Sequence, residues 1–492
     1  MNILFATSEV SPFARTGGLA DVSASLAVAL KEQGHQVVVF VPAYRSVFEC
    51  EVPVKELGIH FSVPVGENLV DASLCKSTLP GSDVPVYFIR QDDYYDRDEI
   101  YTSHGIDYPD NCERFVFFCR AVMEAIRVLG LKVDILHSND WQTGLIPAYQ
   151  SILYKNEHHY EQIATIHTVH NLAYQGIFWH WDMLLTGIGW EHFTFNELEF
   201  YGKLNLLKTG LMFADGITTV SPRYALEIQS PTFGCSLESV LQYRSPMLRG
   251  ILNGVCTNHW NPDTDPWIAA QFNAKTVFDK KPLCKADLQK TFEIQCREDI
   301  PLLGVVSRLA YQKGIDLVAD AIPTWVEQHN IQFCLLGQGD PNLENRLTEL
   351  ANRYPANVGV KIGFSDELAH KIEAGADMFL MPSRYEPCGL NQMYSHLYGT
   401  VPIVHDTGGL ADTVVDLNDA TRQSNTATGF SFFADNLYDL NTTIWRALCV
   451  YWQDKETWAT LVRNGMRQNW SWKQSALQYI RFYKKVLKTE KS

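Results

Sequence analysis

NILFA at residues 2–6 and TGGLAD at residues 16–21 predict the first strand, loop and helix of the chain, in that order. The apolar pentapeptide is typical of a buried strand, and a Gly pair is a common connection from a strand to a helix. Apolar residues from Val22 to Leu30 recur at helical spacing, and Gly34 is expected to end the helix. This order of elements indicates an α/β fold.

The same pattern repeats along the chain. Further apolar runs predict strands at 36–41, 133–137, 163–167, 217–220, 302–306, 332–336, 358–362, 378–381 and 401–404. Helical patterns separate most of these runs, and such alternation implies parallel, doubly wound sheets. Ligands of these sheets bind beyond the carboxyl ends of the strands, so the residues directly after each strand are the candidates for function.

The hexapeptide TGGLAD recurs unchanged at residues 407–412, after the strand predicted at 401–404. Each copy lies between a strand and a helix, where glycine lets backbone N–H groups approach a ligand and the helix end favours negative charge. Local turn chemistry explains one copy, and both copies could be simple connectors. Two identical copies suggest two sites with similar chemistry.

Composition indicates a protein of two or more domains. The length of 492 residues allows more than one full core, and residues 245–266, rich in Asn, Pro and Gly, are the expected boundary. The formal net charge of −15 argues against a nucleic-acid partner.

Cysteine usage and the N-terminus indicate a cytoplasmic protein. The eleven cysteines are odd in number and irregularly spaced, which is typical of reduced thiols rather than of disulfides. The sequence contains no CxxC pair and no Cys/His cluster, so we expect no structural zinc site. The N-terminus lacks a basic region before its first apolar run, and no apolar run approaches the roughly 20 residues that span a bilayer.

Polar or glycine-rich residues follow five of the predicted strands. These stretches are Ser138–Trp141, Thr168–Asn171, Ser307 and Arg308 with Gln312–Gly314, Pro382–Leu390, and the second TGGL. A cation at a helix start opposes the helix dipole, so Lys313 is easier to explain beside an anion.

Each candidate also has a plain structural explanation. His170 could be a hydrogen-bonded structural residue, Arg308 and Lys313 could be surface charges, and Glu386 could be a favourable charge at a helix start.

Two DxD motifs, at 96–98 and 263–265, have the spacing that could hold a metal-bound diphosphate. Both lie in irregular polar stretches, so we expect no metal site there. The residues 337–339, GQG, lack the third glycine of a dinucleotide fingerprint, and no phosphate-binding GxxxxGK[ST] motif occurs.

With these residues in view, the chain resembles bacterial glycogen synthases and plant starch synthases from Ile3 to about Tyr483. The resemblance rests on TGGLADV (16–22), HTVHNLAYQGIF (167–178), TTVSPRYALEI (218–228), ILNGV (251–255), SRLAYQKGIDL (307–317), LLGQGDP (335–341), MPSRYEPCGLNQM (381–393) and TGGLADTV (407–414).

The resemblance implies an α/β fold of two doubly wound, Rossmann-like domains facing a cleft, the GT-B type, with a C-terminal helix that crosses back to the N-terminal domain. Residues 1–250 with 473–492 would form the glucan-side domain, and residues 251–472 the nucleotide-sugar domain.

The activity implied by the resemblance is transfer of glucose from ADP-glucose to the non-reducing end of an α-1,4-glucan such as glycogen, with retention of configuration. No cofactor, metal, nucleic acid or membrane is implied, and the oligomeric state stays open. The implied catalytic residues are His170, Arg308, Lys313 and Glu386. The implied substrate-binding residues are Arg15, Gly17, Gly18, Asp21, Tyr95, Asp140, Asn171, Asn253, Phe364, Cys388, Gly389, Leu390, Tyr394, Thr407, Gly408 and Gly409.

The chain departs from the family pattern at several positions. Arg15 replaces a usual Lys, Cys256 an acidic residue, His405 a frequent Arg and Phe364 a common Tyr, while Ser236 and Ser239 replace glycines. Arg forms a planar fork that Lys cannot, so the first change is not neutral. Two alternatives stay open: a GT-B transferase that uses another donor such as UDP-glucose, and a catalytically weak glucan-binding paralogue.

Overall fold

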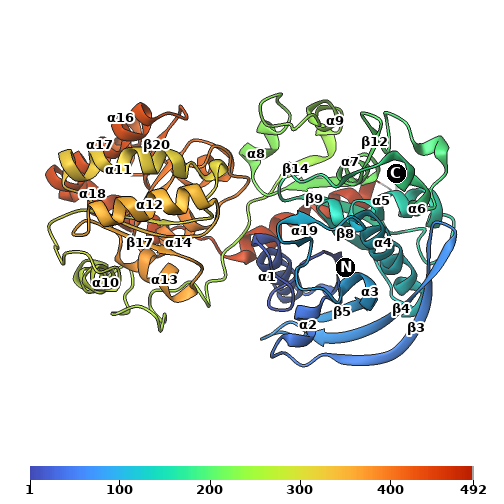
Figure 1. The fold of residues 1–492 in the computed structure, drawn as a ribbon. Coiled ribbons are helices and arrows are strands. Elements are labelled where there is room, and N and C mark those ends of the chain that lie inside the picture. Colours follow the sequence, from blue (N-terminus) through green and yellow to red (C-terminus); the bar gives the residue numbers. More distant parts are fainter. Residues whose placement is uncertain (490–492) are drawn as a thin grey trace. The chain divides into compact units, whose positions relative to one another are not determined.

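The computed structural model describes residues 1–489, which form two compact units (Figure 1). The first unit comprises Met1–Gly254 and the chain from Trp472 onward, and the second comprises Val255–Ser471. The last three residues of the predicted segment 473–492 lie outside the described residues.

The first unit is built on a twisted mixed sheet. Within residues 1–489 its strand order is β14 (Leu248–Gly250), β13 (Gly216–Thr219), β9 (Ala164–Val169), β8 (Ile135–Asn139), β1 (Asn2–Ala6), β2 (Gln36–Pro42), β5 (Pro85–Arg90), β4 (Asn68–Thr78) and β3 (Lys55–Val65). The sheet is parallel from β14 to β5, and β4 and β3 add an antiparallel edge.

Helices and short strands complete the first unit. The helices are α1 (Gly18–Glu32), α2 (Arg45–Glu49), α3 (Asp92–Tyr95), α4 (Asn111–Val128), α5 (Leu145–Tyr149), α6 (Met183–Thr186), α7 (Leu206–Phe213), α8 (Pro222–Glu227), α9 (Glu238–Tyr243) and α19 (Trp472–Thr489). The short strands are β6 (Thr102–Ser103), β7 (Ile106–Asp107), β10 (Ile177–Phe178), β11 (Glu199–Phe200) and β12 (Lys203–Asn205).

The predicted return of the C-terminal helix to the N-terminal domain is confirmed. Helix α19 lies beside α1 (Figure 1), and Tyr479 and Tyr483 on this helix are fully buried in the core of the first unit. The Tyr483 hydroxyl lies 2.7 Å from Nδ1 of His137 on β8. Apolar burial holds the helix against the core, and this buried polar contact additionally specifies its position along the sheet.

The second unit is built on a parallel sheet with the order β17 (Val358–Ile362), β16 (Gln332–Gly337), β15 (Leu302–Val306), β18 (Met378–Met381), β19 (Val401–His405) and β20 (Phe430–Phe432). Its helices are α10 (Val277–Thr291), α11 (Ile315–His329), α12 (Pro341–Arg353), α13 (Asp366–Gly375), α14 (Asn391–Leu397), α15 (Gly408–Thr413), α16 (Asp419–Gln423), α17 (Leu437–Gln453) and α18 (Lys455–Met466).

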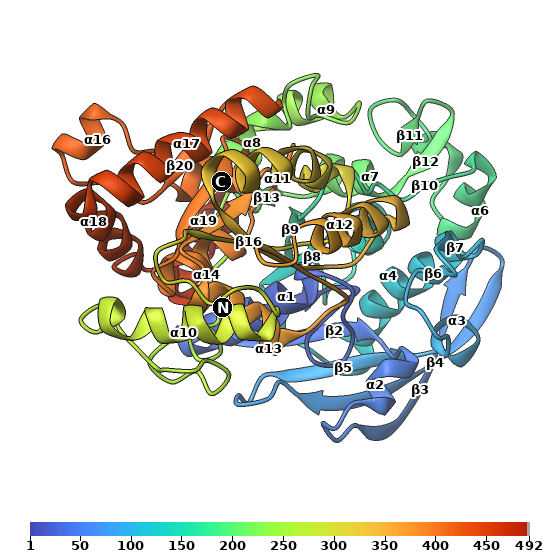
Figure 2. The ribbon, with the colours of Figure 1, turned by 60° about the vertical axis from the view of Figure 1, so that its left-hand side comes forward.

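Helices cover both faces of the second sheet, as a doubly wound fold requires. Leu303 and Val305 of β15 pack in one core cluster with residues of α11 and α12, which lie side by side in Figure 2. Leu302 points to the other face and packs with Leu288 of α10 and Ile372 of α13. This alternation follows from the two-residue period of a strand.

Several predicted boundaries were wrong by a few residues. β8 runs to Asn139 rather than ending at 137, and β9 runs to Val169 rather than 167. The polar residue Thr168 continues the strand because its backbone pairs with both neighbouring strands. Helix α1 begins at Gly18, before the predicted start, while Gly34 follows its end with φ +83° as predicted.

The antiparallel strands β3 and β4 were not predicted. β3 alternates between more and less exposed residues over much of its length, which is the pattern of an edge strand with one covered face. Its neighbour β4 has the same character. The continuous apolar runs of the other strands predict a strand more strongly than this alternating pattern does.

No helix within residues 1–489 is both long enough and apolar enough to cross a membrane. All eleven cysteines lie in this part of the chain and are free thiols.

Candidate active site

The predicted site residues fall into two groups, one in each unit. The first unit contains Arg15, Gly17, Gly18, Asp21, Tyr95, Asp140, His170, Asn171 and Asn253, and the second contains Arg308, Lys313, Phe364, Glu386, Cys388, Gly389, Leu390, Tyr394, Thr407, Gly408 and Gly409.

Glu386 is the centre of the group in the second unit. It lies in the loop after β18, and only 7% of its surface is exposed. Its Oε2 lies 2.5 Å from Nζ of Lys313 and accepts a hydrogen bond of 2.9 Å from Oγ of Ser383. The next helix begins only at Asn391, so Glu386 is not a helix-start charge.

Lys313 and Arg308 differ in how their charges are compensated. Lys313 lies in a 3₁₀ turn, Tyr311–Lys313, just before α11, and Glu386 neutralises its charge. Arg308 is exposed and donates a long hydrogen bond of 3.4 Å to Gln312. None of the ion pairs found within residues 1–489 includes Arg308, so it offers an uncompensated positive charge after β15.

The second TGGL packs directly against the loop that carries Glu386. Gly408 has φ +46°, and a Cβ on it would lie 2.0 Å from the Glu386 carbonyl oxygen. A Cβ on Gly409 would lie 1.9 Å from the Cys388 carbonyl oxygen, and the Gly409 amide donates to the Glu386 carbonyl at 3.0 Å. Only glycine fits at these two positions.

His405 ties the end of β19 to the same loop. Its Nδ1 lies 2.8 Å from the Ser383 carbonyl oxygen and its Nε2 lies 3.1 Å from the Phe433 carbonyl oxygen. Both ring nitrogens therefore lie within hydrogen-bond distance of a backbone carbonyl, and the one that carries the proton donates to it. His405 thereby connects the Glu386 loop to the residues that follow β20.

In the first unit, the ends of β8 and β9 bring Asn139, Asp140 and His170 together. The Asn139 side-chain amide donates to the Ala6 carbonyl at 3.0 Å, which leaves its oxygen 2.9 Å from Nε2 of His170. Nε2 therefore carries the proton of the neutral ring, and Nδ1 is an acceptor. Burial lowers the pKa of His170 to about 3, so the ring is neutral at physiological pH.

Asp140 has a strained backbone at the carboxyl end of β8. Its φ of +54° lies in the left-handed region, which a residue other than glycine seldom adopts. Its Oδ1 accepts the His170 amide at 2.7 Å. Burial nevertheless raises the pKa of the Asp140 carboxyl to about 7, so this group changes charge close to neutral pH.

Glu9 holds the first TGGL loop, and the sequence analysis did not single it out. It is 4% exposed, and its carboxylate accepts the Thr16 amide at 2.6 Å, the Thr16 hydroxyl at 2.6 Å and the Gly17 amide at 3.2 Å. The Tyr101 hydroxyl donates to the same carboxylate at 2.8 Å. The signal available in the sequence was an acidic residue shortly after the first predicted strand.

The two TGGL copies therefore have different local structures. A Cβ at Gly17 or Gly18 would meet no atom of the described residues within 4 Å, apart from its own chain neighbours, whereas the second copy is closely packed. Arg15, before the first copy, lies 3.2 Å from the Asp21 carboxylate, and both side chains are partly exposed.

The prediction of Tyr95 as a substrate-binding residue is corrected by its burial. Its side chain is 0% exposed, and its hydroxyl donates to the Arg114 carbonyl at 2.7 Å. The ring packs edge-on against Tyr44. A side chain enclosed in this way holds the core of the first unit and cannot reach a ligand.

The other predicted residues differ in exposure. Phe364, after β17, is 76% exposed, while Asn253 is 6% exposed. The Asn253 side-chain oxygen accepts no hydrogen bond from any residue in the range 1–489. Tyr394 stacks on Trp260 with ring centroids 3.8 Å apart and planes within 7°.

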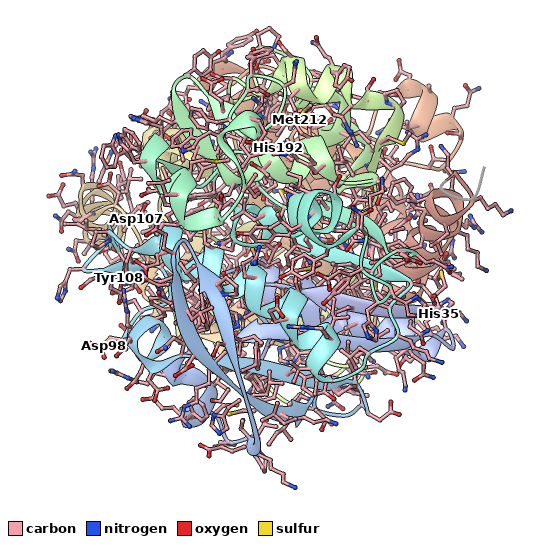
Figure 3. The ribbon with its side chains drawn as sticks, turned by 90° about the vertical axis from the view of Figure 1, so that its right-hand side faces the viewer. His35, Asp98, Asp107, Tyr108, His192 and Met212 are labelled. Atoms are coloured by element: carbon pink, nitrogen blue, oxygen red, sulfur yellow. The ribbon has the colours of Figure 1, made fainter. Side chains whose placement is uncertain are left out.

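The acidic residues of the DxD motifs are occupied by protein groups. Arg45 forms ion pairs with both Asp96 and Asp98, and Figure 3 labels Asp98 near the surface. Asp265 lies 2.6 Å from Nδ1 of His370. No cluster of three or more His, Cys, Asp or Glu side chains suited to a metal occurs in the described part of the chain.

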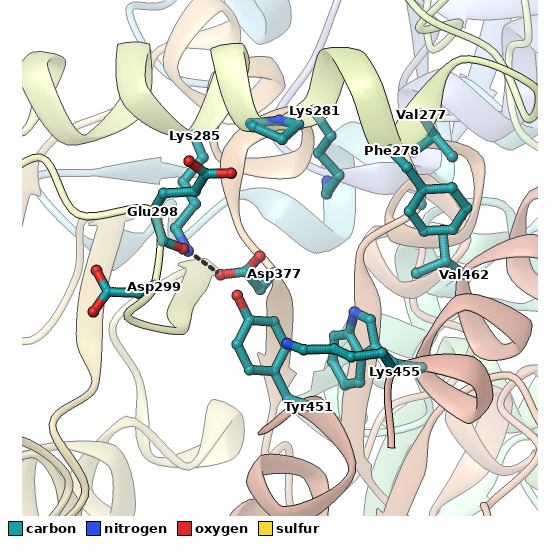
Figure 4. Close-up of a pocket in the computed structure, with 13 residues that line it drawn as sticks. Val277, Phe278, Lys281, Lys285, Glu298, Asp299, Asp377, Tyr451, Lys455 and Val462 are labelled. Carbon is teal, nitrogen blue, oxygen red and sulfur yellow. Dashed lines mark hydrogen bonds and ion pairs between the residues drawn. The ribbon is translucent and has the colours of Figure 1, made fainter. Parts of the chain in front are cut away.

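A cavity of about 660 Å³ in the second unit lies apart from these residues (Figure 4). Its lining residue Asp377 directly precedes β18, whereas the Glu386 loop follows the strand, so the cavity lies at the opposite edge of the sheet. Lys285 is paired with Asp377 at 2.7 Å, and Lys281 donates to the Ala374 carbonyl at 2.9 Å. Because protein groups already bind these lysines, we assign them a structural role.

Comparisons with known proteins agree over nearly the whole chain. Residues 2–243 match the family model of the starch synthase catalytic domain, and residues 289–445 match that of glycosyl transferases group 1. Glycogen synthase from Rhodopirellula baltica is 44% identical, over 99% of this chain and 98% of its own. Glycogen synthase from Syntrophotalea carbinolica is also 44% identical, over 99% of both chains.

The fold agrees with a solved structure as well. The catalytic domain of starch synthase IV from Arabidopsis thaliana, bound to ADP and acarbose, matches with a TM-score of 0.90 and 32% identity. The match covers 99% of each chain.

Proposed function

The chain belongs to the family of bacterial glycogen synthases and plant starch synthases, and from this premise we propose how its residues transfer glucose from ADP-glucose to an α-1,4-glucan. The family makes it a retaining glucosyltransferase of the GT-B type. We assign the donor to the second unit and the glucan acceptor to the first.

The Lys313–Glu386 ion pair and the exposed charge of Arg308 carry this proposal. The departing diphosphate needs preorganised positive charge, which is commonly the largest contribution to such catalysis. Arg308 supplies a charge that no carboxylate of residues 1–489 neutralises, and Lys313 can turn part of its interaction from Glu386 to the diphosphate. The second TGGL shapes the loop around this pair and contributes backbone dipoles.

Glu386 acts in this scheme as a hydrogen-bond acceptor rather than as a nucleophile. Its Oε2 already accepts hydrogen bonds from Lys313 and Ser383, so this oxygen is not free to attack the sugar. The other oxygen, Oε1, is the atom we assign to sugar hydroxyls. Retention then relies on the diphosphate as the base, rather than on the paired carboxylates that retaining hydrolases use.

His170, Asp140 and Asn253 serve the sugar from the first unit. Neutral His170 keeps Nδ1 as an acceptor for a sugar hydroxyl, since Nε2 donates to Asn139. The Asn253 oxygen is a buried acceptor without a partner in residues 1–489, and such an atom is costly unless a ligand donates to it.

Arg15 is the residue of the first unit that we assign to the phosphate groups of the substrate. Glu9 holds the loop that contains Arg15 and Gly17. The exposed glycines Gly17 and Gly18 leave the backbone of this loop open to a ligand. We place the enzyme in the cytoplasm, where free thiols such as its eleven cysteines persist.

Release of ADP or UDP from the two nucleotide sugars, with glycogen as acceptor, tests the function. We expect ADP-glucose to be the better donor and the glycogen to be elongated. Glycogen binding without transfer from either donor would instead identify a glucan-binding paralogue. A clear preference for UDP-glucose would overturn the assignment of the donor.

A further inference from the structure

Large aromatic side chains are exposed together in the segment between β10 and β12 of the first unit. We call Trp179, Trp181, Trp190, Phe195 and Tyr201 the aromatic surface. Their exposed fractions are 62%, 49%, 42%, 75% and 79%, respectively. His192, labelled in Figure 3, belongs to the same segment. Soluble proteins seldom expose such a set without a ligand or partner for it.

The tryptophan rings of this surface are turned relative to one another. The rings of Trp179 and Trp181 lie 6.3 Å apart at 66°, and those of Trp181 and Trp190 lie 5.6 Å apart at 79°. Ring faces therefore point in several directions rather than forming one flat platform. This arrangement suits a bent chain whose units each present an apolar face to a ring.

The polar residues of the segment indicate the chemistry of the ligand. Asp182, Glu191 and Glu197 are interspersed among the rings, and no Lys or Arg occurs from 179 to 201. An anionic ligand such as a nucleic acid or an acidic lipid surface would be repelled. The cores of protein interfaces are depleted of charged residues. Carboxylates and aromatic faces together suit a neutral ligand with many hydroxyl groups.

The aromatic surface is continuous with the candidate acceptor residues. β10 is the next strand of the chain after His170 and Asn171. The Phe178 ring lies 5.7 Å from that of Trp141, the neighbour of Asp140. Both belong to the first unit. A polymer whose end lies at His170 therefore has a path toward Trp179 and Trp181 on the same unit.

We propose that the aromatic surface is a second, non-catalytic binding site for the α-glucan, which holds part of the polymer away from its reacting end. The identity of the glucan rests on the proposed function. The surface would raise the affinity for long or branched acceptors, since two contacts on one polymer reinforce each other. It would not act on short oligosaccharides.

Electrophoresis through native gels containing glycogen, without any donor, tests this proposal. We expect the double variant Trp179→Ala/Trp181→Ala to bind glycogen roughly tenfold more weakly, a loss of about 1.4 kcal/mol. Its turnover with maltotriose as acceptor should stay within about twofold of the wild type. Tyr438→Ala removes a 78% exposed ring from the second unit and is the matched control.

Wild-type retardation of the folded double variant by glycogen would overturn the proposal. Trp181→Phe should retain most of the binding, because it keeps a ring at the site. A wild-type protein that is retarded by glycogen but releases no ADP from ADP-glucose would refute the transferase function and leave the binding surface intact. The two failures are therefore distinguishable.

Discussion

The Lys313–Glu386 ion pair is expected to link catalysis to the stability of the second unit. The side chains are 19% and 9% exposed and their charged atoms are 2.5 Å apart. Removing one member of such a buried pair leaves the other charge uncompensated, at a cost of about 3 kcal/mol. We therefore expect Lys313→Met and Glu386→Gln each to lower the urea midpoint of the second unit.

The double variant Lys313→Met/Glu386→Gln has no unpaired charge left. We expect it to recover stability, with a coupling energy of about 1–3 kcal/mol between the two sites. The turnover number should behave differently, because both groups are assigned to the substrate. Each single variant should lose at least about 100-fold in kcat, and the double variant should recover none of it.

Urea unfolding followed by fluorescence, together with ADP release, measures both quantities. Arg308→Ala is the matched control, since Arg308 is exposed and has no ion-pair partner among residues 1–489. It should lose a similar factor in kcat while its urea midpoint stays within experimental error. Additive stability losses in the double variant would refute the ion pair as a coupled unit. Full activity in Lys313→Met would refute its role at the diphosphate.

Four further outcomes are expected. Glu9→Gln should lower kcat about tenfold with little change in ADP affinity, because charge-assisted hydrogen bonds to the first TGGL loop are about twice as strong as neutral ones; unchanged steady-state kinetics would contradict this role. Gly408→Ala should lower the melting temperature sharply, since its Cβ would meet the Glu386 carbonyl, whereas Gly18→Ala should leave it unchanged; equal melting temperatures would argue against the packing. Burial lowers the pKa of His396 to about 4, so its contribution to stability is fully present above pH 6.5 and is lost as the pH falls toward 4, by about 1.4 kcal/mol per pH unit. In His396→Phe the urea midpoint should depend less on pH between pH 6.5 and 4.5, and an unchanged pH dependence would exclude this histidine as its source. EDTA should leave ADP release intact, and inhibition that Mg²⁺ or Mn²⁺ reverses would point back to a metal.

The strand-to-helix pattern of the chain determined its fold class from the sequence alone. Short apolar runs such as Asn2–Ala6 and Leu302–Val306 are fully parallel strands in the structure. Local periodicity suffices here because a strand buried on both faces must be apolar throughout. The edge strand Lys55–Val65 escaped prediction because a strand covered on one face has only half of that signal.

The family and the reaction class also followed from the sequence, because short motifs such as the residues around Glu386 resemble those of a known family. The sequence could not show that Lys313 and Glu386 neutralise each other across 73 residues. Nor could it separate Tyr95, enclosed in the core, from residues that a ligand can reach. Partners far apart in sequence are set by strand order and side-chain packing.

The two copies of TGGLAD show most clearly what the sequence alone does not determine. The two copies are identical in sequence, and each predicts the same local turn between a strand and a helix. The tertiary structure makes them different: Glu9 binds the amides of Thr16 and Gly17, while Gly408 and Gly409 lie against the carbonyls of another loop. Local conformation follows from the residues themselves, but their role depends on the atoms that the rest of the fold brings beside them.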